Sequence, residues 1–175
     1  MKKLDILEKA ANTVFLSIGS NLGNKEYNIE KTKSLIDTNF IRILSSSSNY
    51  VTPSWPNPNF PNYINIILKI KTNLNLEKLF LFLKDVESEM GRKDKKKNYP
   101  RTCDIDIIDF NQMNTSLNIG NNKIIVPHPR MHKRNFVLFP LYEVQNNWKH
   151  PKNNENILSL ILKISIKEIS TIKLM

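Results

Sequence analysis

The sequence predicts an α+β fold in which helices pack on a mainly antiparallel sheet. Segments of strand and helix character alternate along the chain, and the predicted helices are too few to cover both faces of a doubly wound parallel sheet. The 175 residues include 40% hydrophobic and 24% charged residues, which suits one compact domain. We expect that domain to cover residues 13–175, after an N-terminal extension of residues 1–12.

The first part of the chain supplies two predicted strands, a helix and a long loop. Residues 14–18 (VFLSI) have the composition of a buried strand. Asn24 is a suitable N-cap for a helix over about residues 25–37. Residues 40–50 are expected to form a second strand. Residues 52–61 contain four prolines, so we expect a surface loop there, long enough to have a function.

A strand over residues 63–71 shows the clearest pattern. Ile64, Ile66, Leu68 and Ile70 alternate with Tyr63, Asn65, Ile67, Lys69 and Lys71. Successive side chains of a strand point to opposite faces, so the first set is expected in the core and the second set outside. Tyr63 and Asn65 then share the outer face.

The rest of the chain continues the alternation of helices and strands. An amphipathic helix is predicted over residues 75–90, with Gly91 as its end. The later elements are predicted as a strand at 102–110, a short extended segment at 123–126, helices at 136–144 and 156–163, and a last strand at 166–174.

Positive charge is concentrated in one short segment. The chain has 26 Lys and Arg against 16 Asp and Glu, a net charge of +10. Residues 92–101 carry six of these basic residues and one aspartate, a local charge of +5. Such a cluster suits a polyphosphate as well as a nucleic acid, and it is equally compatible with a solvated, mobile loop. Arg92 and Arg101 stand at its two ends, where guanidinium groups can grip phosphate oxygens.

The tripeptide Asp104-Ile105-Asp106 is a candidate metal site. Residues i and i+2 of a strand point to the same side, so the two carboxylates can converge on a cation. Hard oxygen ligands favour Mg²⁺. A solvated strand face is the alternative, but the adjacent basic segment favours the metal, because Mg²⁺ beside arginines is a common arrangement for stabilising a polyphosphate.

Two histidines lie in the segment 127–136 (PHPRMHKRNF). His128 and His132 have the spacing of helical zinc ligands, but no Glu follows His128 and Pro129 disfavours a helix through both. We instead expect His128 to be a neutral hydrogen-bonding partner and Arg134 to contact a phosphate.

Several function classes lack their sequence signals. The chain has no Gly-x4-Gly-Lys-Ser/Thr segment and no dinucleotide-binding fingerprint. Its single cysteine, Cys103, is expected in the core rather than as a nucleophile. No apolar run approaches the roughly 20 residues of a membrane span, and the first residues do not resemble a signal peptide. We therefore expect a cytoplasmic protein with no membrane or nucleic-acid partner.

Taken together, these segments resemble the 6-hydroxymethyl-7,8-dihydropterin pyrophosphokinase family of folate biosynthesis. The resemblance rests on FLSIGSNLG at 15–23, YVTP at 50–53, NYIN at 62–65, PRTCDID at 100–106 and the segment from Pro127 to Leu141. It covers most of the chain from Val14 to about Pro151, and the paired segments at 100–106 and 127–141 are highly specific.

This resemblance implies a ferredoxin-like α+β fold, a monomer, and transfer of pyrophosphate from ATP to the pterin hydroxymethyl oxygen with release of AMP. It implies two Mg²⁺ ions on Asp104 and Asp106, with Arg92 and Arg101 stabilising charge during transfer. The implied pterin-binding residues are Thr52, Pro53, Trp55, Tyr63, Asn65 and Phe136. The implied ATP-binding residues are Glu87, Arg92, Arg101, Ile107, Lys123, His128 and Arg134.

The sequence also departs from the family pattern. Lys84 stands where the family's helix usually carries glutamine, and Tyr99 stands where glycine is common before the Pro-Arg pair. Two other functions remain as alternatives: a non-catalytic homologue that still binds pterin, and a basic RNA-binding module.

Overall fold

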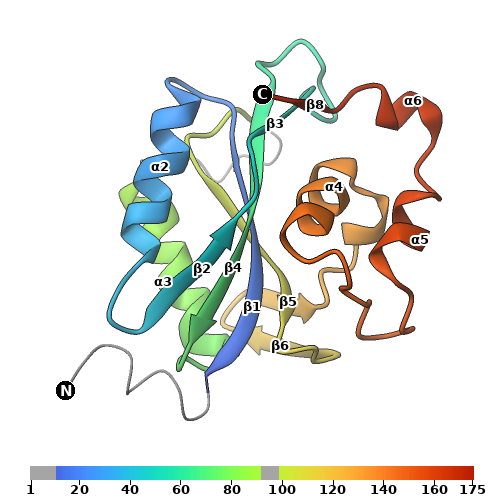
Figure 1. Cartoon of the computed structure of the whole chain (residues 1–175). Helices are drawn as coiled ribbons and strands as arrows, with labels where there is room; N and C mark the ends of the chain where they lie inside the picture. Colours follow the sequence, from blue (N-terminus) through green and yellow to red (C-terminus); the bar gives the residue numbers. More distant parts are fainter. Residues whose placement is uncertain (1–10, 92–98) are drawn as a thin grey trace.

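A six-stranded antiparallel sheet forms the centre of the molecule (Figure 1). The computed structural model describes residues 11–91 and 99–175. The strands of the sheet are β1 (Asn12–Ser20), β2 (Ile41–Ser46), β3 (Tyr50–Thr52), β4 (Tyr63–Thr72), β5 (Asp104–Phe110) and β8 (Lys173–Leu174). Their order is β5-β1-β4-β3-β8, with β2 also paired to β4. This arrangement confirms the predicted α+β class with an antiparallel sheet.

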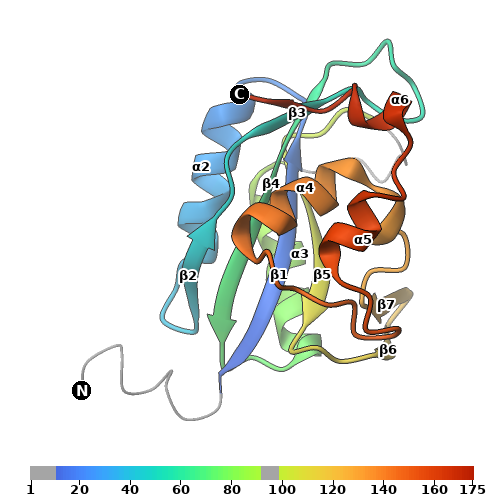
Figure 2. The same ribbon diagram turned by 45° about the vertical axis from the view of Figure 1, so that its right-hand side comes forward.

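Helices cover both faces of this sheet (Figures 1 and 2). One face carries α2 (Lys25–Ile36) and α3 (Leu76–Glu89), and the other carries α4 (Asn135–Val144) and α5 (Ile157–Ile161). The alternate side chains of each strand therefore enter two separate cores. Leu16 and Leu68 belong to the core under α2 and α3, whereas Ile67 belongs to the core under α4 and α5. We call the second face the α4 face.

Asparagine caps set the starts of three helices. The side chains of Asn24, Asn75 and Asn156 each accept a hydrogen bond from a backbone N–H in the first turn of α2, α3 and α5, respectively. The predicted helices at about 25–37, 75–90 and 156–163 are thereby confirmed, with shorter ends. Gly91 follows α3 with a φ of +85°, a value that glycine adopts without a steric cost.

The strand register aligns the centre of the sheet. β1 pairs antiparallel with β4 on one side and with β5 on the other. Gly19 of β1 therefore lies opposite both Asn65 of β4 and Asp104 of β5, and Ser17 lies opposite both Ile67 and Asp106. Residues of three strands thus form successive rows across the sheet.

Three expectations about the elements were wrong. The strand expected at 40–50 is two strands, β2 and β3, interrupted at residues 47–49. The last strand expected at 166–174 is a short helix, α6 (Ile166–Ile169), followed by the two-residue β8. Ile67 was expected to face outward but is fully buried, because α4 packs over that side of β4.

A hairpin lies beside the main sheet. β6 (Thr115–Ile119) and β7 (Asn122–Val126) pair antiparallel and form a separate two-stranded sheet. β7 matches the extended segment predicted at 123–126, whereas β6 was not predicted. A short 3₁₀ helix, η1 (Met131–Lys133), then leads into α4, which confirms the helix predicted at 136–144.

The predicted N-terminal extension, residues 1–12, lies mostly outside the described residues. Among the helices of residues 11–91 and 99–175, none has the length and hydropathy needed to cross a membrane.

Candidate active site

Two aspartates lie on one side of β5, near its start. Ile105, between them, points to the opposite side and is buried in the core under α2 and α3. The side chains of Asp104 and Asp106 keep 33% and 36% of their surface exposed. Alternation along the strand therefore places both carboxylates on the α4 face, within reach of solvent and ligand.

Each of these aspartates forms an ion pair with a different arginine. Arg101 Nη1 lies 2.9 Å from Asp104 Oδ1, and Arg134 Nη1 lies 2.9 Å from Asp106 Oδ2. Burial of Arg101 lowers its pKa and is the largest single cause. The charge of Asp104, the hydrogen bond to Asp104 and the interactions with Tyr63 and Glu87 together outweigh it and leave the pKa raised. Asp104 therefore faces a permanently charged guanidinium.

The pKa of Asp106 lies below its ordinary value. Burial raises this pKa. The charge of Arg134, its hydrogen bond to Asp106 and the charge that His128 carries only at the acidic pH where Asp106 titrates together lower the pKa further than burial raises it. Arg134 keeps its charge at any relevant pH, so Asp106 is ionised at neutral pH.

His128 is the third group beside Asp106. Its Nε2 lies 3.8 Å from Asp106 Oδ2, and its Nδ1 accepts a hydrogen bond of 3.3 Å from the backbone N–H of Arg130. Burial is the main cause that lowers the pKa of His128, with Arg134 and Arg130 adding to the effect and Asp106 opposing it. The imidazole is therefore neutral at pH 7, as the sequence suggested.

A glycine leaves space between the two aspartates and the next strand. A Cβ atom at Gly19 would lie 3.0 Å from Asn65 Oδ1 and 3.3 Å from Tyr63 Cδ1. Asn65 is 4% exposed, and its Nδ2 donates a hydrogen bond of 2.9 Å to Thr52 Oγ1, which is equally buried. Asn65 was expected to face outward. It does point to the α4 face, but neighbouring side chains cover it.

Two aromatic residues lie near the row formed by Gly19, Asn65 and Asp104. Tyr63 begins β4 and Phe136 lies in the first turn of α4, and both are partly buried. The Arg134 guanidinium lies 5.4 Å from the centroid of the Phe136 ring. Tyr63 is close enough to Arg101 to contribute to the raised pKa of that arginine. The aromatic residues therefore adjoin the arginines that bind the two aspartates.

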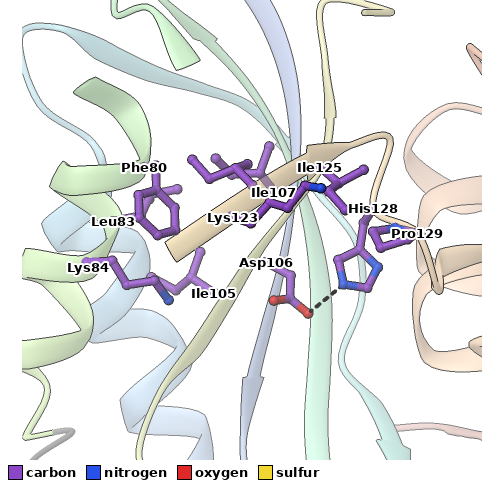
Figure 3. Close-up of a pocket in the computed structure, with 11 residues that line it drawn as sticks. Phe80, Leu83, Lys84, Ile105, Asp106, Ile107, Lys123, Ile125, His128 and Pro129 are labelled. Carbon is purple, nitrogen blue, oxygen red and sulfur yellow. Dashed lines mark ion pairs between the residues drawn. The ribbon is translucent and has the colours of Figure 1, made fainter. Parts of the chain in front are cut away.

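A cavity of about 190 Å³ opens on the other side of Asp106 (Figure 3). It lies between α3, β5 and the hairpin strand β7. Its walls are apolar, and its polar groups are two lysines, Asp106 and His128. The lining residues are Phe80, Leu83, Lys84, Ile105, Asp106, Ile107, Lys123, Ile124, Ile125, His128 and Pro129. An apolar slot with a cationic, acid-containing rim suits a flat heterocycle that carries phosphates.

Glu87 lies behind this cavity wall. It is 2% exposed, and its Oε1 accepts a hydrogen bond of 2.8 Å from the backbone N–H of Ile105. Its Oε2 lies 2.5 Å from Lys84 Nζ. Glu87 thus links α3 to β5 beside the two aspartates. It also forms an ion pair with Lys84, one of the two lysines that line the cavity.

Comparison with known proteins shows which family has this sequence and fold. The family model for 7,8-dihydro-6-hydroxymethylpterin-pyrophosphokinase (HPPK) matches residues 15–146. This chain belongs to the HPPK family. Two bacterial relatives carry the name 2-amino-4-hydroxy-6-hydroxymethyldihydropteridine pyrophosphokinase. The Aquifex aeolicus protein is 37% identical over 140 residues, which are 79% of this chain and 84% of that protein. The Bacillus subtilis protein is 34% identical over 134 residues, covering 76% and 78%.

Solved structures agree on the fold. A crystal structure of Plasmodium falciparum HPPK-DHPS matches with a TM-score of 0.73 at 16% identity. The match covers 94% of this chain and 46% of that chain, so our HPPK chain spans about half of the solved one. The family match also supports pyrophosphoryl transfer in folate biosynthesis, and no comparison favours the non-catalytic or the RNA-binding alternative.

The predicted site residues fall into three groups. Arg92 lies outside the described residues. Trp55 and Pro53 are exposed on the proline-rich loop, with 74% of Trp55 accessible, so the structure does not bring Trp55 into the cluster. The others lie around the acid pair or the cavity: Thr52, Tyr63, Asn65, Glu87, Arg101, Asp104, Asp106, Ile107, Lys123, His128, Arg134 and Phe136.

Sequence reasoning missed part of the cavity. Phe80, Leu83 and Lys84 line it from one face of α3. Their spacing of three and four residues is visible in the sequence, but the same spacing is typical of a helix face that packs on a core. Only the position of α3 beside β5 and β7 in the folded chain shows that these three residues line a cavity.

Proposed function

We propose that this chain is a Mg²⁺-dependent pyrophosphokinase that transfers the terminal pyrophosphoryl group of ATP to 6-hydroxymethyl-7,8-dihydropterin. The observation that supports this most is the position of Asp104 and Asp106. They lie between an apolar cavity on one side and a buried amide with two aromatic residues on the other. A site that joins two flat substrates through a phosphate chain needs this arrangement.

The cavity is our proposed ATP site. Ile107 and the apolar walls from α3 suit the adenine base, while Lys123 and His128 in the cavity suit its phosphates. Arg134, which pairs with Asp106 at the edge of the cavity, suits them too. His128 is neutral and offers hydrogen bonds rather than charge. We assign Glu87 to this site indirectly, because its carboxylate already binds Ile105 and Lys84.

The opposite side of the acid pair is our proposed pterin site. Tyr63 and Phe136 would stack on the pterin ring, and each ring pair contributes roughly 0.5–1.5 kcal/mol beyond area burial. Asn65 would bind the polar edge of the ring, because an amide both donates and accepts hydrogen bonds. Its bond to Thr52 fixes the orientation of that amide. Pro53, which directly follows Thr52, would border the site from the loop.

Asp104 and Asp106 are the residues that would hold two Mg²⁺ ions, and their donor chemistry fits. Both are carboxylates with exposed surface, the hard ligands that Mg²⁺ prefers. Within the described part of the chain, no group of three His, Cys, Asp or Glu forms a protein-only metal site. Two carboxylates nevertheless suffice, because Mg²⁺ is commonly bound by one or two protein carboxylates together with water and substrate phosphates. The ions would neutralise charge on the phosphate chain.

The chain's own residues position the reactants. The pterin hydroxymethyl oxygen attacks the β-phosphorus of ATP, a bond forms between them, and the bond from that phosphorus to the α,β-bridging oxygen breaks. AMP leaves with the electron pair of the broken bond, and the proton of the hydroxyl group passes to solvent. Arg101, with Arg92 at the other end of the basic segment, would stabilise the charge that spreads over the phosphate oxygens. No protein nucleophile takes part.

The test is an AMP-release assay. The purified chain, ATP, Mg²⁺ and 6-hydroxymethyl-7,8-dihydropterin should give AMP and the pterin diphosphate, and omission of either the pterin or Mg²⁺ should stop the release. Pterin binding without AMP would support the non-catalytic homologue instead. RNA binding that weakens steeply with salt and needs no Mg²⁺ would support the nucleic-acid module.

We also propose that the enzyme is a cytoplasmic monomer. Its single cysteine, Cys103, is fully buried, so the fold needs no oxidising compartment. Light scattering coupled to size exclusion should give a mass near 20.4 kDa. A mass of twice this value would contradict the monomer without affecting the reaction.

A further inference from the structure

Three segments meet at the side chain of Asn21. Asn21 follows β1 and is 1% exposed. Its Oδ1 accepts a hydrogen bond of 2.8 Å from the backbone N–H of Arg101. Its Nδ2 donates to Ser54 Oγ at 2.9 Å and to the carbonyl of Pro61 at 3.3 Å. One buried amide thus binds the segment before β5 and two points of the proline-rich loop.

The backbone of Asn21 strengthens the first of these links. Its N–H donates a hydrogen bond of 3.0 Å to the carbonyl of Arg101. Arg101 is therefore held at both its N–H and its carbonyl by a single residue. Its guanidinium is held separately, by Asp104. Both the backbone and the guanidinium group of Arg101, the residue that we assign to charge stabilisation, are therefore held in place.

The links to the loop reach the residues of the pterin site. Ser54 Oγ donates a hydrogen bond of 2.8 Å to the carbonyl of Pro61, so it closes the two ends of the loop on each other. Ser54 lies two residues after Thr52, and Pro61 lies two residues before Tyr63. The Asn21 amide therefore braces the loop at the points where it leaves β3 and enters β4.

We infer that Asn21 is a positioning residue that holds Arg101 and the pterin site in a fixed relation to each other. This inference rests on the proposed function, since it takes both roles from it. Asparagine suits the position because one short side chain must accept one hydrogen bond and donate two. Alanine supplies none of these bonds. The inferred role requires that removal of the amide affects both pterin binding and the chemical step.

Three variants separate the two links. Asn21→Ala removes the side-chain bonds to Arg101 and to the loop. Ser54→Ala weakens the loop side alone, because Asn21 can still accept from the Arg101 N–H. Thr72→Ala is the control: Thr72 is also buried, and its Oγ1 donates a hydrogen bond of 2.9 Å to the carbonyl of Phe40 and accepts one of 3.0 Å from the backbone N–H of Leu74. Thr72 ends β4, at the opposite end of that strand from Tyr63, and neither partner belongs to Arg101 or the proline-rich loop.

The steady-state constants of AMP release give the first readout. Asn21→Ala should lower kcat between about 10-fold and 100-fold and raise the KM for pterin, because small misplacements of a reacting group have effects of that size. Ser54→Ala should raise the KM for pterin with little change in kcat. Thr72→Ala should lower the melting temperature but leave both constants near those of the wild type. If folded Asn21→Ala behaves like Thr72→Ala in both constants, the positioning role is wrong.

A second readout does not depend on activity. In hydrogen exchange, the Arg101 amide should exchange faster in Asn21→Ala than in the wild type, and its exchange should be unchanged in Thr72→Ala. Wild-type protein that releases no AMP would overturn the proposed function. The exchange of the Arg101 amide, together with pterin affinity measured by fluorescence titration, would still test Asn21. Unchanged exchange and unchanged affinity in Asn21→Ala would overturn the inference itself.

Discussion

The α4 face of the sheet divides into two halves with opposite properties. In one half, Phe15, Ile67 and Ile108 are buried under α4 and α5. In the other half, the same three strands present Gly19, Asn65 and Asp104 in one row. We call these the closed half and the open half. β4 therefore changes from site to core between Asn65 and Ile67. The row of Ser17 contains the boundary, because it carries the buried Ile67 on β4 and the partly exposed Asp106 of the open half on β5.

The difference teaches where stability and function are located on this face. The closed half buries side chains against helices and contributes free energy of folding. The open half contains carboxylates with exposed surface and a glycine without a side chain, which contribute little to packing. Variants in the two halves should therefore affect different measurements.

The largest effect is expected in the open half, at Asp106. Asp106→Ala removes a proposed Mg²⁺ ligand and the partner of Arg134, so turnover should fall by about 1,000-fold or more. The fold should persist, because the side chain is 36% exposed. AMP release and thermal unfolding check the two statements. Asp37→Ala, which removes an exposed carboxylate at the end of α2, is the control for charge. Activity of Asp106→Ala at the wild-type rate would remove the metal assignment.

The next effect is expected in the closed half. Ile67→Ala removes a fully buried side chain from the core under α4 and α5, which should lower the free energy of unfolding by about 3 kcal/mol. Urea unfolding measures this change. At a temperature where the variant remains folded, its KM values should stay near those of the wild type. A selective loss of pterin binding in stable protein would show that the two halves are not separate.

The ends of the elements could be predicted from the sequence, whereas the coverage of their faces could not. Asn24 is a local signal that acts within one turn, and it placed the start of α2 correctly. Burial of Ile67 depends on α4, which lies far along the chain. Alternation along one strand separates its two faces but does not show which face another element covers.

The same limit applies to the site. The Asp104-Ile105-Asp106 pattern identified two carboxylates on one side of a strand, because that relation is local. The cavity wall from α3 and the amide of Asn21 depend on contacts between distant segments. β6 (TSLNI) was missed for another reason: it has few apolar residues and pairs only with its hairpin partner β7.

A smaller effect should follow from filling the open half. Gly19→Ala adds a Cβ atom that would lie 3.0 Å from Asn65 Oδ1 and 3.3 Å from Tyr63 Cδ1. Both side chains must then shift, and we expect the KM for pterin to rise by about 10-fold. The KM for ATP should change less, because the cavity lies on the other side of Asp106. Equal changes in both KM values would contradict the separation of the two substrate sites.

The smallest effect is expected from pH, at the edge of the closed half. Burial is the main cause that lowers the pKa of His150, and nearby His132 adds to it. Because the folded-state pKa lies below the unfolded value of 6.5, the neutral imidazole stabilises the fold above pH 6.5. This contribution is lost as the pH falls through the folded-state pKa. Urea unfolding at pH 7.5 and at pH 5.5 should show it.

His150→Gln provides the control for this pH dependence. The variant removes the titrating group, so its stability should fall less between pH 7.5 and pH 5.5 than that of the wild type. An equal fall in both proteins would assign the dependence to other groups, such as His128, whose pKa is also lowered.

The position of β1 has a consequence for how the chain is made. β1 is the first strand of the described chain, but its two neighbours come much later, since Asn12 pairs with Thr72 and Val14 pairs with Phe110. A nascent chain that ends before residue 110 leaves one side of β1 without its hydrogen-bonding partner, and such open edges favour aggregation. The strand that bears Asp104 and Asp106 therefore also supplies the missing partner of β1, so the acid pair and the fully paired form of β1 arise in the same step of synthesis.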